Sequence, residues 1–382
     1  MTVPLRQSSS EVVVDADDFA RRIIEPSDFV ADTAAFIDVR LECSAGKASY
    51  SFIGPGVSQN QDQTVNLDVP HGFNIGAASM AGGVVNGQHL HFTAEVFICT
   101  RGRWRFAIGE HREQTLEIGP GAVFSIPTWV FRGFENIGDD EGWMYTVLGG
   151  DDTGGIIWAP DVLRAAAETG LHLRSDYTVV DGLDGMSAND VVQPLEPAQL
   201  ASVDRYTDSE LAARAVHHED LQWSDHSLLS GSVARHLSAM APVIGHGMTE
   251  DRHHRSPISA AHGFSVEWLR LPGGSSTGLH RHDQNQVVIV IDGSWDIAVN
   301  REEHALHSRP AQGSVVSINS GAWRNLSNVG DCDAHAVVVC ASDQRPAIEW
   351  DPEIVNAARQ AGWSRDASGY IAPVELIGGP VR

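Results

Sequence analysis

Short apolar runs separated by turn residues dominate the chain. Two of them, at 96–109 and 287–300, are rich in β-branched and aromatic residues and are interrupted by a single glycine. Two others, at 121–136 and 313–328, begin at a glycine and then alternate apolar with polar residues. Many short strands with regular turn signals are typical of a β-sandwich or β-barrel. The pattern therefore predicts an all-β protein.

Helical spacing is confined to a few segments. Two short helices are predicted at 160–169 and 352–361, because each begins at a proline and is followed by a glycine, Gly170 or Gly362. Proline at the first helical position and glycine just past the last one is the usual asymmetry of helix ends. Each helix follows a set of predicted strands, so we expect each to close a β-domain.

The segments outside these strand-rich regions have a different texture. The N-terminal arm is expected to contain a helix near 15–24 and a strand at 36–41, and to pack against one of the β-domains. The linker 181–241 has helical spacing, with Thr207 or Asp208 as a plausible N-cap. We therefore expect helical structure in the linker.

The two strand-rich regions, near 50–177 and 242–370, repeat one another. Glycines, tryptophans, an arginine and an asparagine recur at an offset of 191 residues, which becomes 192 after one insertion. The matched pairs are Gly83 and Gly274, Gly102 and Gly293, Trp104 and Trp295, Gly121 and Gly313, Arg132 and Arg324, and Asn136 and Asn328. A constant offset with one slip indicates duplication of a whole domain.

Composition narrows the class of protein. The 382 residues are 42% hydrophobic and 20% charged, which is typical of soluble globular domains. No apolar run reaches the length of a membrane span and the N-terminus has no secretory pattern, so a cytoplasmic location is expected. The formal net charge of −24 repels phosphate backbones and anionic lipid, which argues against nucleic-acid and membrane partners. The four cysteines have no zinc-like spacing and are expected to be reduced thiols.

Each repeat carries two histidines on alternate residues, followed four positions later by a residue with a side-chain oxygen. They are His89, His91 and Glu95 in the first repeat, and His280, His282 and Gln286 in the second. Alternate residues of a strand face the same side of a sheet, so both imidazoles of a pair point in one direction. This arrangement is half of a metal site built on a rigid sheet.

These motifs resemble those of the cupin superfamily. That family's first motif has the spacing of Gly83, His89, His91, Glu95 and Gly102. The second repeat has the same spacing at Gly274, His280, His282, Gln286 and Gly293. The family's second motif has the spacing found in the first repeat at Gly121, Pro127, Trp129, Arg132 and Asn136. In the second repeat it is found at Gly313, Asn319, Gly321, Arg324 and Asn328. The resemblance implies two double-stranded β-helix (jelly-roll) barrels, a bicupin. It implies no single activity, because fold does not fix function.

The resemblance also suggests domain boundaries. An N-terminal arm would occupy 1–49 and the first cupin domain 50–180. A helical linker would follow at 181–241, and then the second cupin domain at 242–382, with a C-terminal helix and tail. Cupins commonly dimerise through sheet edges, so a homo-oligomer is expected.

Both repeats depart from the family pattern at the same place. The histidine that would be a fourth ligand is Arg132 in the first repeat and Arg324 in the second. His89, His91 and Glu95 would still suit Fe(II) with open positions for O2. Arg132 and Arg324 would then orient an anionic substrate. In the alternative interpretation no metal binds, and Glu95 and Arg132 form a buried ion pair that fills the site.

The second repeat is the weaker candidate for metal, because Gln286 leaves its ligand set neutral. A cavity with two histidines, a glutamine and Arg324 would also suit an anion. Three further residues are candidates for substrate binding: Trp129 at the barrel rim, and His71 and His262, which recur in His-Gly-Phe. For the two histidines, a role in a turn or in the core is the competing interpretation.

Three functions are compatible with these residues. The first is a metal-dependent dioxygenase, an oxidoreductase that uses Fe(II) and O2 to cleave a small anionic aromatic or enolisable molecule. The second is a metal-dependent isomerase or lyase that stabilises an enolate without O2. The third is a non-catalytic binder of small molecules, with arginines in place of metals.

Overall fold

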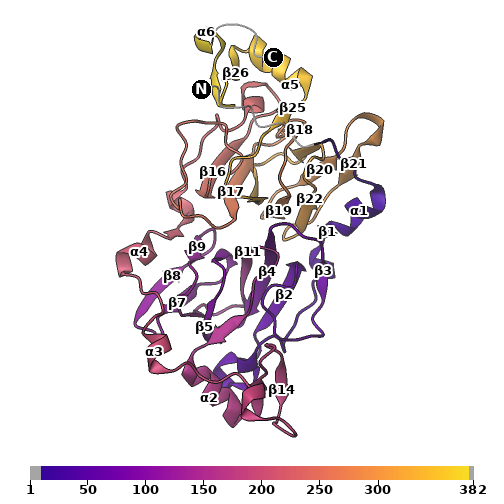
Figure 1. Ribbon diagram of the computed structural model, residues 1–382. Coiled ribbons are helices and arrows are strands. Elements are labelled where there is room, and N and C mark those ends of the chain that lie inside the picture. The colour runs from indigo at the N-terminus through magenta and orange to yellow at the C-terminus, as the bar shows by residue number, and fades with distance from the viewer. Residues whose placement is uncertain (1–9, 378–382) are drawn as a thin grey trace. The chain divides into compact units, whose positions relative to one another are not determined.

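The computed structural model describes residues 10–377, so the first nine residues of the predicted arm and the last five of the predicted C-terminal tail lie outside it. The chain folds into two compact units (Figure 1). One is Phe29–Asp220 and the other joins Met1–Asp28 to Leu221–Arg382. Short antiparallel strands dominate both, which confirms the all-β prediction. Between residues 10 and 377, no helix combines the length and the apolar character needed to cross a bilayer.

The unit Phe29–Asp220, called the first barrel below, is a jelly-roll of two large sheets. Its seven-stranded sheet has the order β15 (Ala215–Val216), β9 (Val123–Ile126), β6 (Glu95–Arg101), β11 (Gly142–Gly149), β4 (Phe73–Met80), β2 (Ala48–Ile53) and β3 (Val65–Leu67). Its five-stranded sheet has the order β12 (Ile156–Trp158), β5 (Val85–His91), β10 (Arg132–Asn136), β7 (Trp104–Ile108) and β8 (Gln114–Ile118). A small hairpin adds β13 (Leu171–Leu173) and β14 (Val179–Asp181). Phe97 of one sheet packs on Phe106 of the other with ring centroids 4.8 Å apart, and such contacts form the core between the sheets.

The other unit, called the second barrel, repeats this architecture. Its six-stranded sheet has the order β1 (Ile23–Ile24), β22 (Val315–Ile318), β19 (Gln286–Val290), β24 (Ala334–Ala341), β17 (Phe264–Leu271) and β16 (Ala239–Ile244). Its five-stranded sheet has the order β21 (Leu306–Ser308), β20 (Trp295–Val299), β23 (Arg324–Asn328), β18 (His280–Arg281) and β25 (Glu349–Trp350). A hairpin of β26 (Trp363–Arg365) and β27 (Ile371–Pro373) follows.

The two barrels share the same strand register. Arg132 of β10 lies opposite His89 of β5, and Arg324 of β23 lies opposite His280 of β18. Residues that match in the sequence repeat are therefore also cross-strand neighbours at matching positions of the two barrels. The structural repeat has the same origin as the sequence repeat.

A short helix follows the long strands of each barrel, as predicted. These helices are α2 (Pro160–Glu168) and α5 (Pro352–Gln360), each with proline at its first position. Gly170 and Gly362 follow them with φ of 89° and 88°, a left-handed conformation that glycine adopts without a steric penalty.

The remaining helical segments are short. The α-helices are α1 (Ala16–Arg21), α3 (Pro197–Leu200), α4 (Asp208–Ala212) and α6 (Val374–Ile377). The 3-10 segments are η1 (Pro26–Asp28), η2 (Ile37–Arg40), η3 (Glu42–Ser44), η4 (Ala188–Asp190), η5 (His218–Asp220), η6 (Leu229–Ser232) and η7 (Glu302–His304). Thr207 is the N-cap of α4 and forms a capping box with Glu210, which confirms the predicted helix start in the linker.

The N-terminal segment divides between the two units. Strand β1 pairs with β22, and the Arg22 guanidinium donates to Ser317 Oγ at 3.0 Å, so residues up to Asp28 belong with the second barrel. The strand predicted at 36–41 is wrong, because Ile37–Arg40 is the 3-10 segment η2. The tight turn places the Asp38 carboxylate inside the first barrel, where it accepts the Gly87 N–H at 2.9 Å.

Candidate functional site

A pocket in the first barrel contains the candidate metal ligands of the first repeat. Its walls come from β2, β4, β5, β6, β10, β11 and β12, from Lys47 and from the segments 32–36 and 54–58. His89, His91 and Glu95 all line it. The pocket is therefore where the chemistry of these three side chains would act.

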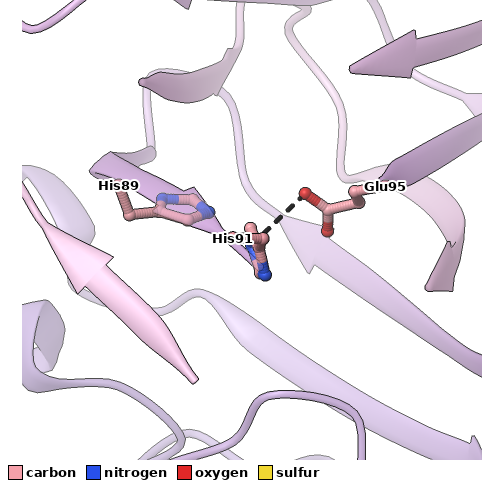
Figure 2. A group of neighbouring side chains, drawn as sticks. All are labelled: His89, His91 and Glu95. Carbon is pink, nitrogen blue, oxygen red and sulfur yellow. Dashed lines mark ion pairs between the residues drawn. The ribbon is translucent and has the colours of Figure 1, made fainter. Parts of the chain in front are cut away.

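The three side chains converge although they come from two strands. His89 and His91 lie on β5, and Glu95 is the first residue of β6. One ligand atom from each lies within 4.8 Å of the others, and Figure 2 shows the His91 imidazole facing the Glu95 carboxylate. His91 Nε2 is 3.5 Å from Glu95 Oε2. Within residues 10–377 this is the one group of at least three His, Cys, Asp or Glu side chains with such spacing.

Both imidazoles are neutral near pH 7. Burial lowers the pKa of His89 and of His91 well below the usual value, and the nearby Arg132 charge lowers both further. His89 Nδ1 lies 2.7 Å from the Gly87 carbonyl oxygen, which fixes the proton on Nδ1 and leaves the Nε2 lone pair available. Neutral histidine is the form that binds metals.

His91 offers the clearest sign that the site suits an ion. Both of its ring nitrogens are buried, and neither has a hydrogen-bond partner among the described residues. Buried polar atoms are almost always satisfied, because an unsatisfied one costs about 1–3 kcal/mol. An ion bound by His89, His91 and Glu95 would satisfy His91, so these residues fit a divalent metal.

Arg132 holds the carboxylate of this group. Its Nε and Nη2 atoms lie 3.3 and 3.2 Å from Glu95 Oε2, and its Nη1 donates to the Val130 carbonyl at 3.1 Å. Burial raises the pKa of Glu95, and the Arg132 charge opposes that rise. The ion pair of the metal-free interpretation is thus formed, but it leaves the two histidines facing the pocket. Arg132 itself is fully buried and is not among the residues that line the pocket, so its catalytic role stays a prediction.

The corresponding residues of the second barrel are arranged differently. Arg324 Nη1 lies 2.9 Å from His282 Nε2 and 3.3 Å from Gln286 Oε1. Arg324 Nη2 donates to the Asn319 carbonyl at 2.7 Å. A metal at His282 Nε2 would have to displace this guanidinium. Burial and Arg324 lower the pKa of His280 to about 3. The weaker metal site predicted here stays a prediction.

Comparison with known proteins identifies the fold of the two barrels. A family model described as Cupin domain matches residues 267–340, which lie in the second barrel. The chain has the bicupin fold. It duplicates the cupin fold, as its motifs predicted.

Solved structures with this fold cover nearly the whole chain. One is an oxalate decarboxylase from Lactobacillus farciminis in complex with formate, with 14% identity, TM-score 0.55, and coverage of 91% of this chain and 92% of that one. Another is an oxalate decarboxylase from Bacillus subtilis at pH 4.6, with 13% identity, TM-score 0.53, and coverage of 91% and 81%. A third, of the same enzyme, concerns its Mn(II) centres, with 14% identity, TM-score 0.53, and coverage of 91% and 82%. At these identities the likeness is one of fold. No curated protein matches the chain.

The interiors of the two barrels differ at positions that the register makes equivalent. Gly76 pairs with Thr146 across β4 and β11, and Glu267 pairs with Val338 across β17 and β24. Gly76 and Thr146 line the first pocket, whereas Val338 belongs to the apolar core of the second barrel. At these positions the second interior thus has a glutamate where the first has only a glycine, and an apolar valine where the first has a threonine of similar size.

Glu267 is a buried acid that sequence reasoning missed. Its Oε1 accepts the Met248 N–H at 2.8 Å, and its Oε2 is buried without a hydrogen-bond partner among the described residues. Burial raises its pKa to about 8, so it is largely protonated near neutral pH. The available signal was a single charged residue in the middle of the apolar run 264–269, at the position of Gly76.

The predicted substrate-binding residues lie away from the pocket. Trp129 is 42% exposed and packs edge-on against Phe92, with a φ of 59° where the second barrel has Gly321. His71 and His262 are buried, and each ring contacts the backbone carbonyl two residues earlier. None of these side chains lines the pocket. Their assignment to substrate binding stays a prediction.

Proposed function

We propose that the first barrel is the active site of a metal-dependent enzyme that acts on a small organic anion. The observation that carries this proposal is the convergence of His89, His91 and Glu95 at the wall of one pocket. Two further features support it, namely the unsatisfied ring of His91 and the neutral state of both imidazoles. A convergent set of perturbed titratable groups in a pocket is the usual mark of an active site.

The chain's own residues have distinct parts in this proposal. His89, His91 and Glu95 would hold the ion, which when bound would supply Lewis acidity toward an oxyanion of the substrate. Arg132 acts as a positioning residue, since its two contacts to Glu95 Oε2 fix the rotamer of the carboxylate. The Gly87 carbonyl fixes the tautomer and orientation of His89. Burial of all three ligands keeps water from competing for them.

For the reaction we favour a lyase that cleaves a carbon–carbon bond without O2, in the manner of a decarboxylase. The structures of similar fold support this class, because those compared above are oxalate decarboxylases, one with formate and one described for its Mn(II) centres. An anionic substrate also agrees with the charge of the site. Glu95 and Arg132 cancel and the histidines are neutral, so a divalent ion would make the site positive.

A dioxygenase is the second candidate, and the identity of the ligands favours it. Two histidines and one carboxylate form the set that non-haem Fe(II) enzymes use, with positions left for O2 and substrate. The two reactions differ in their need for oxygen. The non-catalytic binder proposed from the sequence would bind anions whether or not metal is present.

Metal binding is the first test. We expect metal-free protein incubated with Mn(II) or Fe(II) and desalted to keep about one ion per chain, measured by elemental analysis. Glu95→Gln is expected to weaken binding by at least about tenfold, because a neutral amide replaces the charged ligand, and loss of a ligand contact to a charge costs more than about 1.4 kcal/mol. Gln286→Asn, at the equivalent position of the second barrel, is the matched control and should keep the ion. Wild-type protein that retains no ion, or Glu95→Gln that binds like wild type, would refute the metal centre.

The reaction class is tested under strict exclusion of oxygen. We expect the manganese-loaded protein to release CO2 from at least one member of a panel of small carboxylic acids without O2, at the same rate as in air. A decarboxylation needs no oxidant, which is the reason for this result. Turnover that stops without O2 and consumes O2 in air would instead support the Fe(II) dioxygenase. Glu95→Gln serves as the inactive control in both atmospheres.

A further inference from the structure

The only lysine in the sequence, Lys47, lies in the wall of the same pocket as the candidate metal ligands. It directly precedes β2 and is 7% exposed. A buried ammonium is expensive unless it is paired and hydrogen-bonded. Such a group beside a candidate active site calls for a physical explanation.

Two polar partners and two aromatic rings surround the Lys47 ammonium. It forms an ion pair with the Asp38 carboxylate, and it donates to Asn86 Oδ1 at 2.7 Å. Its Nζ atom also lies 5.0 Å from the centroid of the Phe36 ring and 5.8 Å from that of Trp158. An ammonium has three N–H donors, and Asp38 and Asn86 account for two of them. Among the described residues no acceptor is found for the third donor, which is thus available to a group in the pocket that Lys47 lines.

Lys47 is separated from the metal ligands by one side chain. Asn86, which accepts from Lys47, has its Nδ2 atom 3.3 Å from His89 Nδ1. Trp158 contacts both Lys47 and His89, because its ring centroid lies 5.8 Å from Lys47 Nζ and 5.3 Å from the centroid of the His89 ring. A small molecule bound at His89 and His91 therefore lies within reach of the Lys47 ammonium.

We propose that the free N–H of Lys47 donates to a carboxylate of the ligand, whose body lies against the Phe36 and Trp158 rings. The ligand class is a compact, flat carboxylate. This inference deepens the proposed function, in that it places the substrate in the same pocket, but recognition by Lys47 does not itself require the metal.

A purely structural role is the competing explanation. Asp38 also accepts the Gly87 N–H at 2.9 Å and the Ser44 hydroxyl at 3.1 Å, so it attaches the η2–η3 segment to β5. Lys47 could simply neutralise this carboxylate. In that case the charge of Lys47 would matter for folding, and it would not discriminate between ligands of equal shape and different charge.

A pair of matched ligands separates these explanations. Benzoate and benzamide have nearly the same shape, and only benzoate is charged. Because the chain has one lysine, ¹⁵N-lysine labelling gives a single side-chain signal. We expect benzoate to shift this signal and to bind at least about tenfold more tightly than benzamide, as a charge-assisted hydrogen bond provides.

Variants complete the test. Lys47→Met alone leaves Asp38 buried and unpaired, so the informative variant combines Asp38→Asn with Lys47→Met, because the introduced amide oxygen can still accept from Gly87 and Ser44. This double variant is expected to bind benzoate no better than benzamide, whereas wild type binds benzoate at least about tenfold more tightly. A lysine signal that does not respond to millimolar benzoate, or a double variant that keeps the preference, would overturn the proposal.

Measurements on metal-free and Mn(II)-loaded protein distinguish the two proposals. A preference for benzoate in protein that binds no ion would support Lys47 and refute the metal centre. One bound ion per chain with no preference for benzoate would support the metal centre and refute the proposed role of Lys47.

Discussion

Replacing Arg132 with methionine is expected to destabilise the first barrel of the metal-free protein by about 3–5 kcal/mol, which is the usual cost of removing one partner of a buried ion pair. Arg132 is fully buried and its Nε and Nη2 atoms hold Glu95 Oε2. Methionine fills similar space but leaves the carboxylate without a counter-charge. Urea unfolding in the presence of a chelator measures the change in the free energy of unfolding.

Two variants control this prediction. Glu95→Gln combined with Arg132→Met removes both charges, and it should recover much of the lost stability, because a buried pair replaced by neutral groups is often nearly neutral overall. Arg324→Met in the second barrel should cost less than Arg132→Met, since Arg324 contacts carbonyl oxygens, Gln286 and His282, and no carboxylate contact is found for it among the described residues. A loss below about 1 kcal/mol for Arg132→Met would show that the pair is not a buried ionic one.

Replacing Glu267 with glutamine is expected to raise the free energy of unfolding of the second barrel by roughly 4 kcal/mol more at pH 8 than at pH 5. The pKa of Glu267 is raised from 4.5 to about 8 in the folded protein. Between these two values the folded state binds a proton that the unfolded state has released, so wild-type stability is complete below about pH 4.5 and falls as the pH rises toward 8. Glutamine cannot titrate, and its carbonyl oxygen can still accept the Met248 N–H.

The measurement is urea unfolding at several pH values between about 5 and 8. Wild type should lose stability across this range relative to Glu267→Gln, and the two should differ least at the acidic end. The same comparison at pH 5 is the internal control, because both side chains are then neutral in the folded state. Parallel pH profiles for the two proteins would show that Glu267 has an ordinary pKa.

Much of this protein could be predicted from local sequence patterns. Alternating strands and the repeat offset determined two all-β barrels, because the alternation of side chains in a strand depends only on neighbouring residues. The motif around His89 and His91 determined that both imidazoles share a face, for the same reason. The ends of α2, α4 and α5 also followed from their prolines, glycines and the Thr207 cap.

Local patterns could not determine which distant segments meet. The strand predicted at 36–41 is the 3-10 segment η2, because Asp38 binds the Gly87 N–H and Lys47, contacts that no neighbouring residue reveals. The same contacts brought Lys47 into the pocket, although it lies far in sequence from His89.

The sequence determined the two barrels and the shared register of their motif residues, while only the tertiary structure decided how the barrels differ. Arg132 and Arg324 occupy equivalent positions, yet one binds the Glu95 carboxylate and the other lies against His282. Glu267 and Val338 occupy the positions where the first barrel has a pocket lined by Gly76 and Thr146. Strand periodicity sets which side chains point inward, but the space and charge between two facing sheets depend on all of those side chains together.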